Sequence, residues 1–178
     1  ISKTGCGVST ATKLAELLSA DCKFTAAITS ANLLHNPLGE GVYDIIEVFE
    51  QKEQLRTLCG FEEGIKEIDW KDSKKGPTEI ILLAADLRAC RAIAVLTSCS
   101  VLSNPIGAEG AAALIDVYEK NPKLLTLLGI EEGVTEINFS EKKVDVGQCM
   151  VLAAELRAGR VTAALIKVDV SGNSEVGG

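Results

Sequence analysis

The chain has 178 residues, of which 47% are hydrophobic and only 4% aromatic, and its formal net charge at neutral pH is −7. This length suits one domain of ordinary size, and the aliphatic composition favours a core of many thin layers. The acidic charge argues against nucleic acid or an anionic membrane as a direct partner, because both repel an acidic surface. No apolar run reaches about 18 residues without a charge, so the sequence predicts no membrane-spanning helix.

Short strands are predicted in chain order, because the spacing LxxLxLxxNxL recurs along the sequence. In each match, alternating apolar residues suit a strand with one buried face. The asparagine that follows is expected to turn its side-chain amide onto exposed backbone groups. The matches begin at Ile28, Ile65, Leu96, Val134 and Leu165. Residues 1–27 precede them as a partial unit, and long units alternate with short ones.

Helices are predicted after the strands. Residues 110–120 place apolar side chains at helical spacing with charged ones opposite, and residues 146–157 repeat the pattern. Residues 14–20 are interpreted as the end of another helix. Neither a strand nor a helix of this kind can bury its apolar face alone, so the units are expected to stack into a curved array.

Two apolar inserts, residues 55–61 and 124–130, lengthen the long units and precede Glu-Glu-Gly runs. We expect each insert to form a short extra strand or turn against the strand-start edge of the array. Trp70 and Phe139 occupy equivalent strand positions and are predicted to be core residues.

The units pair into a longer repeat, because Asn36, Asn104 and Asn173 lie 68 and 69 residues apart. The run Asn104-Pro-Ile-Gly-Ala-Glu-Gly-Ala-Ala-Ala-Leu114, together with the alternation of unit lengths, resembles the ribonuclease-inhibitor class of leucine-rich repeat proteins. The resemblance implies an α/β solenoid of about five parallel strands on a concave face, with helices on the convex face. We expect residues 1–178 to form one such domain, incomplete at both ends and covered there by another chain or a second copy.

Partner-binding residues are expected on the concave face, where the strand side chains between the apolar positions point. Acidic stripes then alternate with neutral ones, and a row of carboxylates suits a basic helix or loop of a protein partner. A solvated acidic surface is the alternative interpretation. The candidate residues are Asn32, His35, Glu67, Asp69, Asp72, Ser100, Glu136, Asn138, Glu141 and Asp169.

No constellation of residues indicates catalysis, a metal or a cofactor. The six cysteines form no CxxC pair, and the lone His35 lies near none of them in sequence. We interpret the cysteines as reduced thiols of an intracellular, cytoplasmic protein. Paired carboxylates such as Asp69 and Asp72 occupy a repeated surface position, which does not favour acid–base catalysis.

The sequence therefore predicts a non-catalytic protein–protein interaction module without a nucleic-acid or membrane partner. Two alternatives stay open. One is a regulatory repeat domain of a larger sensor or GTPase-activating protein, and the other is a structural subunit of a large assembly.

Overall fold

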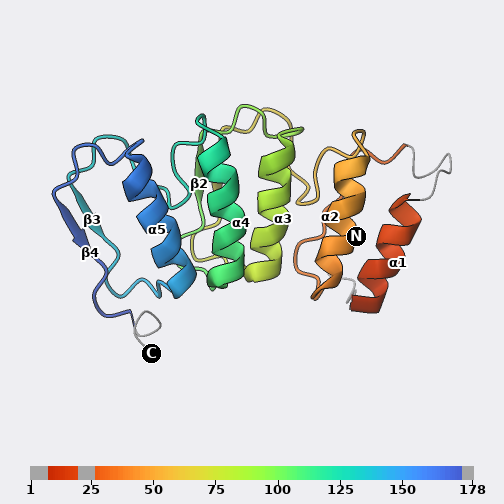
Figure 1. Ribbon diagram of the computed structural model, residues 1–178, viewed down its shortest axis with the longest axis horizontal. Coiled ribbons are helices and arrows are strands. Elements are labelled where there is room, and N and C mark those ends of the chain that lie inside the picture. The colour runs from red at the N-terminus through yellow and green to blue at the C-terminus, as the bar shows by residue number, and fades with distance from the viewer. Residues whose placement is uncertain (1–7, 20–26, 174–178) are drawn as a thin grey trace. The chain divides into compact units, whose positions relative to one another are not determined.

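The computed structural model describes residues 8–19 and 27–173, and their elements are of the α/β class (Figure 1). The chain divides into two compact units. Unit 1 comprises residues 1–64 and 81–94, and unit 2 comprises residues 65–80 and 95–178. The helices are α1 (Val8–Ser19), α2 (Gly41–Gln51), α3 (Pro77–Ala89), α4 (Gly107–Lys120) and α5 (Val146–Ala158). The strands are β1 (Glu67–Asp69), β2 (Ser98–Ser100), β3 (Glu136–Asn138) and β4 (Lys167–Asp169).

The strands form two separate parallel pairs, β1 with β2 and β3 with β4. The expected solenoid, with about five strands on a concave face and helices on a convex face, is therefore wrong: the described residues contain four short strands in two two-stranded sheets. The strand expected from Ile28 is reduced to isolated bridges at Ser30 and Asn32. The helices predicted over 110–120 and 146–157 are confirmed as parts of α4 and α5.

The inserts explain why the sheet is interrupted. In unit 2, Ser98 of β2 forms a parallel bridge with Thr126, whereas Ser100 forms an antiparallel bridge with Leu128. These are isolated bridges of two different types, so the insert does not continue the regular parallel ladder of β1 and β2. The insert also occupies the edge of β2 that a further strand would need. In unit 1 the other insert, around residues 57–59, bridges the segment near Ser30 in the same way.

A buried carboxylate holds each insert in place. In unit 2, Glu155 of α5 accepts hydrogen bonds from the hydroxyl group of Thr126 at 3.0 Å and from the backbone N–H groups of residues 127–128. In unit 1, Asp86 of α3 accepts the equivalent bonds from residues 57–59. A carboxylate without access to water requires such donors. The two inserts therefore keep one conformation because each has a buried acceptor beneath it.

Two arginines close the C-terminal ends of helices. Arg91 donates hydrogen bonds to four backbone carbonyl groups at and beyond the end of α2, and its guanidinium lies 4.7 Å from the centre of the Phe49 ring. Arg160 donates to three carbonyl groups at and beyond the end of α4 and lies 3.9 Å from the Tyr118 ring. Carbonyl groups at a helix end have no partner within the helix, so each guanidinium satisfies several at once.

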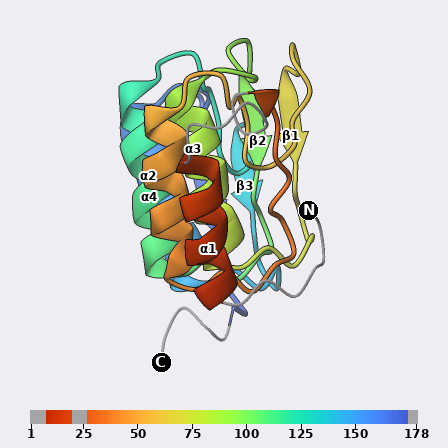
Figure 2. The same cartoon turned by 90° about the vertical axis from the view of Figure 1, so that its right-hand side faces the viewer.

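In unit 2, β1, β2 and β3 lie on the side opposite α4 (Figure 2). The side chain of Asn104 donates to the carbonyl groups of Val101, Leu102 and Trp70, and its Oδ1 accepts from the N–H group of Lys75 at 2.8 Å. This amide joins the turns that follow β1 and β2. The amide of Asn104 therefore binds the backbone of the turns after the strands, as the repeated asparagine led us to expect.

The two aromatic residues of the equivalent strand positions differ in burial. Phe139 is buried, as predicted for a core residue. Trp70 is only half-buried, and the ammonium group of the buried Lys75 lies 5.1 Å from its ring centre. The core prediction for Trp70 therefore holds only in part, because a cation shares its environment.

Candidate functional site

The strands of unit 2 present charged side chains to solvent, and we call this surface the strand face. In β1 the two outer residues, Glu67 and Asp69, are exposed and the central Ile68 is buried. The same alternation occurs in β3. A buried central residue anchors the backbone, so the outer side chains start from a fixed position. The polar residues of the strand face are Glu67, Asp69, Glu136, Asn138, Lys167 and Asp169.

Four of the predicted partner-binding residues share a local structural role. Each accepts a hydrogen bond at its side-chain Oδ1 from the backbone N–H group two residues further on, at 2.9 to 3.2 Å. In β4 the Ser171 hydroxyl also donates to Asp169, and these two bonds lower the pKa of that carboxyl group. Such turns shape the exit of the chain from each strand. The four residues are Asn32, Asp69, Asn138 and Asp169.

The glutamate side chains of the strand face make fewer hydrogen bonds and ion pairs than its aspartate and asparagine side chains. The side chain of Glu67 makes no hydrogen bond or ion pair with any described residue. Glu136 lies 3.4 Å from the ammonium group of Lys167, and both side chains are well exposed. An exposed pair of this kind contributes little to stability. These two carboxylates are therefore accessible to an incoming cation.

Ser100 was predicted to lie on an accessible surface, but the structure buries it. Its exposed fraction is 9%, and the insert covers it: a Cβ atom added at Gly129 would lie only 2.9 Å from the Cβ of Ser100. In unit 1, Gly60 has the same relation to Asn32, again at 2.9 Å, although Asn32 keeps an exposed side chain. The inserts thus pack over the strand positions of the long units.

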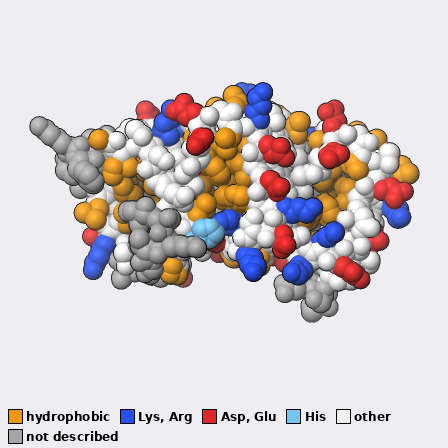
Figure 3. Space-filling view, turned by 180° about the vertical axis from the view of Figure 1, so that it is seen from behind, with side chains coloured by type: hydrophobic (Ala, Val, Ile, Leu, Met, Phe, Trp, Pro, Cys, Tyr) orange, Lys and Arg blue, Asp and Glu red, His pale blue; other side chains and the backbone are white. Residues whose placement is uncertain are grey.

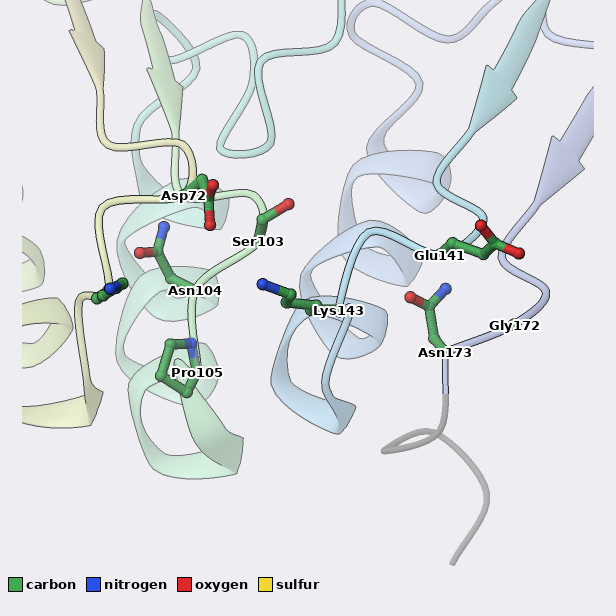
Figure 4. A pocket seen from close by; sticks show the side chains of 9 residues that line it. Asp72, Ser103, Asn104, Pro105, Glu141, Lys143, Gly172 and Asn173 are labelled. Atoms are coloured by element: carbon green, nitrogen blue, oxygen red, sulfur yellow. The ribbon is translucent and has the colours of Figure 1, made fainter.

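A cavity of about 360 Å³ lies where the strands of unit 2 end, and we call it the strand-end groove (Figure 4). It is formed by the turns that follow β1, β2, β3 and β4. An adjoining hollow of about 200 Å³ adds Lys71 and Lys142. The residues that line the groove are Asp72, Lys74, Ser103, Asn104, Pro105, Glu141, Lys143, Gly172 and Asn173.

The charged residues that line the groove share a left-handed backbone conformation. Asp72, Lys74, Glu141 and Lys143 all have positive φ angles, between 52° and 56°. Figure 4 shows the side chain of Lys143 reaching into the groove toward Asn104 and Pro105. Left-handed backbone is unfavourable for these residue types, so the surrounding structure must hold it.

The groove carries acidic and basic side chains that do not pair with one another. None of the side chains of Asp72, Lys74, Glu141 and Lys143 forms an ion pair or hydrogen bond with another described residue. Figure 3 shows acidic and basic side chains interspersed with apolar ones on the strand side. The sequence prediction included the two acids and missed the two lysines. The signal was present, because a lysine follows each acid by two residues in both copies of the repeat.

The remaining predicted residues lie in unit 1. His35 is exposed at a turn with a φ angle of 61°, and Asn32 precedes it. The strand face and the strand-end groove belong to unit 2 alone.

No protein-family model matches the chain. No curated protein matches it either. Among the described residues, no group of three or more His, Cys, Asp or Glu side chains is placed to hold a metal ion. None of the described helices is long and apolar enough to cross a membrane.

The described cysteines Cys59, Cys90, Cys99 and Cys149 are free thiols. Burial raises the pKa of the Cys99 thiol, which keeps it protonated. Cys6 and Cys22, like most of the partial first unit, lie outside the described residues.

Proposed function

We propose that the protein is a non-catalytic protein–protein interaction module that binds a basic surface of its partner on the strand face of unit 2. The observation that carries the proposal is the exposure of Glu67 and Glu136 on strands whose central residues are buried. A cationic segment would gain contacts with carboxylates that have no stronger partner within the described part of the chain.

The rigidity of the scaffold supports binding at this surface. Ile68 and Ile137, the central residues of β1 and β3, are each only 4% exposed. Their burial immobilises the backbone before a partner arrives. Less conformational entropy is then lost on association than for a disordered acidic segment. Charge complementarity at such a surface accelerates association and selects between partners.

Two further parts of the proposal concern the kinship of the repeat and the location of the protein. The motif around Asn104 supports kinship of the repeat unit with the ribonuclease-inhibitor class of leucine-rich repeat proteins. The free thiols support a cytoplasmic location.

The proposal is tested by reversing the charge of the strand face. A double variant, Glu67→Lys with Glu136→Lys, leaves Asp69 and its turn intact. Proteins captured from a cell extract by the wild type and by the variant are compared by quantitative mass spectrometry. We expect the specific partners of the wild type to be lost, with an unchanged melting temperature.

The matched control is Glu47→Lys with Glu53→Lys, two exposed residues of unit 1 that change the net charge by the same amount. The control is expected to keep the wild-type partners. An identical partner list for all three proteins would contradict the proposal.

A further inference from the structure

If the proposed function holds, the charges of the strand-end groove also specify the charge pattern of a partner segment that binds there. Two copies of the same turn face one cavity: Asp72 and Lys74 from the first, Glu141 and Lys143 from the second. All four side chains lack an ion-pair partner among the described residues. The cavity therefore holds two cations and two anions that are available to a ligand.

We infer that the strand-end groove receives an extended segment of the protein partner in which acidic and basic side chains alternate. Its acidic side chains contact Lys74 and Lys143, and its basic side chains contact Asp72 and Glu141. The turns after all four strands of unit 2 contribute to the cavity, so the segment crosses from one turn to the next.

Electrostatic selection favours this occupant over a segment of one charge. A purely acidic segment would approach Asp72 and Glu141, and a purely basic one would approach Lys74 and Lys143. Placing like charges together is unfavourable and discriminates against the wrong partner. Only a segment with both signs can match all four groups.

The shape of the groove agrees with side-chain insertion. Its volume of about 360 Å³ lies at the lower end of the range for ligand pockets in proteins. The cavity thus accepts a few side chains while the backbone of the segment passes above it. At Gly172 the turn after β4 packs closely against the turn after β3, because a Cβ atom there would lie 2.9 Å from the Cγ of Glu141.

The test uses three synthetic peptides of equal length, one of alternating Glu and Lys, one of Glu alone and one of Lys alone. Binding to the full chain is measured by fluorescence anisotropy at low ionic strength. Two double variants reverse the charges, Lys74→Glu with Lys143→Glu and Asp72→Lys with Glu141→Lys. The control pairs are Lys13→Glu with Lys123→Glu and Glu47→Lys with Glu53→Lys, all at exposed positions.

Each peptide is expected to gain or lose affinity according to the charges that the variant reverses. The alternating peptide loses about tenfold in affinity with either groove variant, since each removes two of its ion pairs. The Lys peptide gains affinity when the lysines are reversed and loses it when the acids are reversed. The control pairs change the affinity of the alternating peptide by less than about twofold.

The inference is overturned if the alternating peptide gains affinity with one groove variant, or if the groove variants act no differently from the controls. Retained fold is checked by circular dichroism and thermal unfolding. A negative peptide result leaves the proposed function standing if Glu67→Lys with Glu136→Lys still removes the partners. If that variant is also without effect, the proposed function fails as well.

Discussion

Glu155 carries a carboxyl group that is fully buried in unit 2 and accepts hydrogen bonds from one insert. Burial raises its pKa from 4.5 to about 7, against the opposing effects of the hydrogen bonds from residues 126–128 and the positive charge of Arg160. Asp86 has the equivalent position in unit 1, and burial raises its pKa as well. Each carboxyl group therefore holds an insert by hydrogen bonds, and its raised pKa makes its charge depend on the pH.

The raised pKa of Glu155 predicts a pH-dependent stability. Between pH 4.5 and about 7 the folded protein binds a proton that the unfolded chain has released. This contribution to the free energy of unfolding is complete below pH 4.5 and is lost as the pH rises through about 7. The loss is on the order of 3 kcal/mol, from about 1.4 kcal/mol per pKa unit.

The variant Glu155→Gln tests this, because an amide does not titrate. We expect urea denaturation between pH 5 and pH 8 to show a smaller fall in unfolding free energy for the variant than for the wild type. Glu132→Gln changes an exposed side chain and is expected to keep the wild-type slope. Equal slopes for all three proteins would exclude Glu155 as the titrating group.

Asp69 and Glu67 lie on the same strand and face solvent, yet only Asp69 accepts a backbone hydrogen bond, from Lys71 at 2.9 Å. We expect Asp69→Ala to lower the unfolding free energy by about 1 kcal/mol, because the N–H group of Lys71 loses its acceptor. Glu67→Ala is expected to change it by less than about 0.5 kcal/mol. The measurement is equilibrium denaturation in urea, and a larger loss for Glu67→Ala would reverse the assignment of roles.

At the scale of elements, α4 and α5 pack closely because glycine lies between them. A Cβ atom added at Gly147 would lie 2.2 Å from the carbonyl oxygen of Gly107 and 2.8 Å from the Cγ1 of Ile106. The nearest atoms belong to backbone, which cannot move aside as a flexible side chain does. The side chain of Asp145 strengthens this junction by accepting from the N–H groups of Gly107 and Gln148.

Gly147→Ala should therefore separate α5 from α4. We expect a loss of about 2 kcal/mol or more in unfolding free energy, because the clash is with backbone. The control is Gly76→Ala, whose added Cβ would approach only the far end of the Glu79 side chain, at 3.4 Å. Thermal unfolding of both variants measures the difference, and an unchanged melting temperature for Gly147→Ala would show that the helices can separate at no cost.

At the scale of the whole molecule, the net charge of −7 acts on every approaching partner. The strand face concentrates part of this charge on unit 2, while the lysines of the strand-end groove offset it locally. Long-range attraction then governs the approach of a basic partner, and local charge pairs govern its final position.

Association with the Lys peptide is predicted to depend strongly on ionic strength. Raising NaCl from about 20 mM to about 200 mM shortens the screening length, so the association rate should fall about tenfold. Stopped-flow fluorescence measures this rate. The variant Glu67→Lys with Glu136→Lys should show a weaker dependence, and a salt-independent rate in the wild type would contradict electrostatic attraction.

Helix positions and turn chemistry were accessible to sequence reasoning because they depend on nearby residues. The apolar spacing of α4 matches its buried residues, whereas in α5 the apolar Val146, Met150 and Leu156 are exposed. The amide of Asn104 bonds to carbonyl groups two and three residues before it. The positions of Glu67 and Glu136 on the outer side of strands agreed with the alternation around Ile68 and Ile137. The lysines of the groove were overlooked because their importance depends on two turns that are far apart in sequence.

The sequence by itself determined the repeat, the helices α4 and α5, the asparagine turns and the exposed acids of the short units, since each depends on side chains within a few residues. Only the tertiary structure decided that the strands form two pairs, that Ser100 is covered, and that four turns enclose a groove. These features depend on contacts between residues about thirty positions apart, such as Glu155 with Leu128. The free energy of burying an insert, and not a local pattern, selects which edge of a strand is occupied.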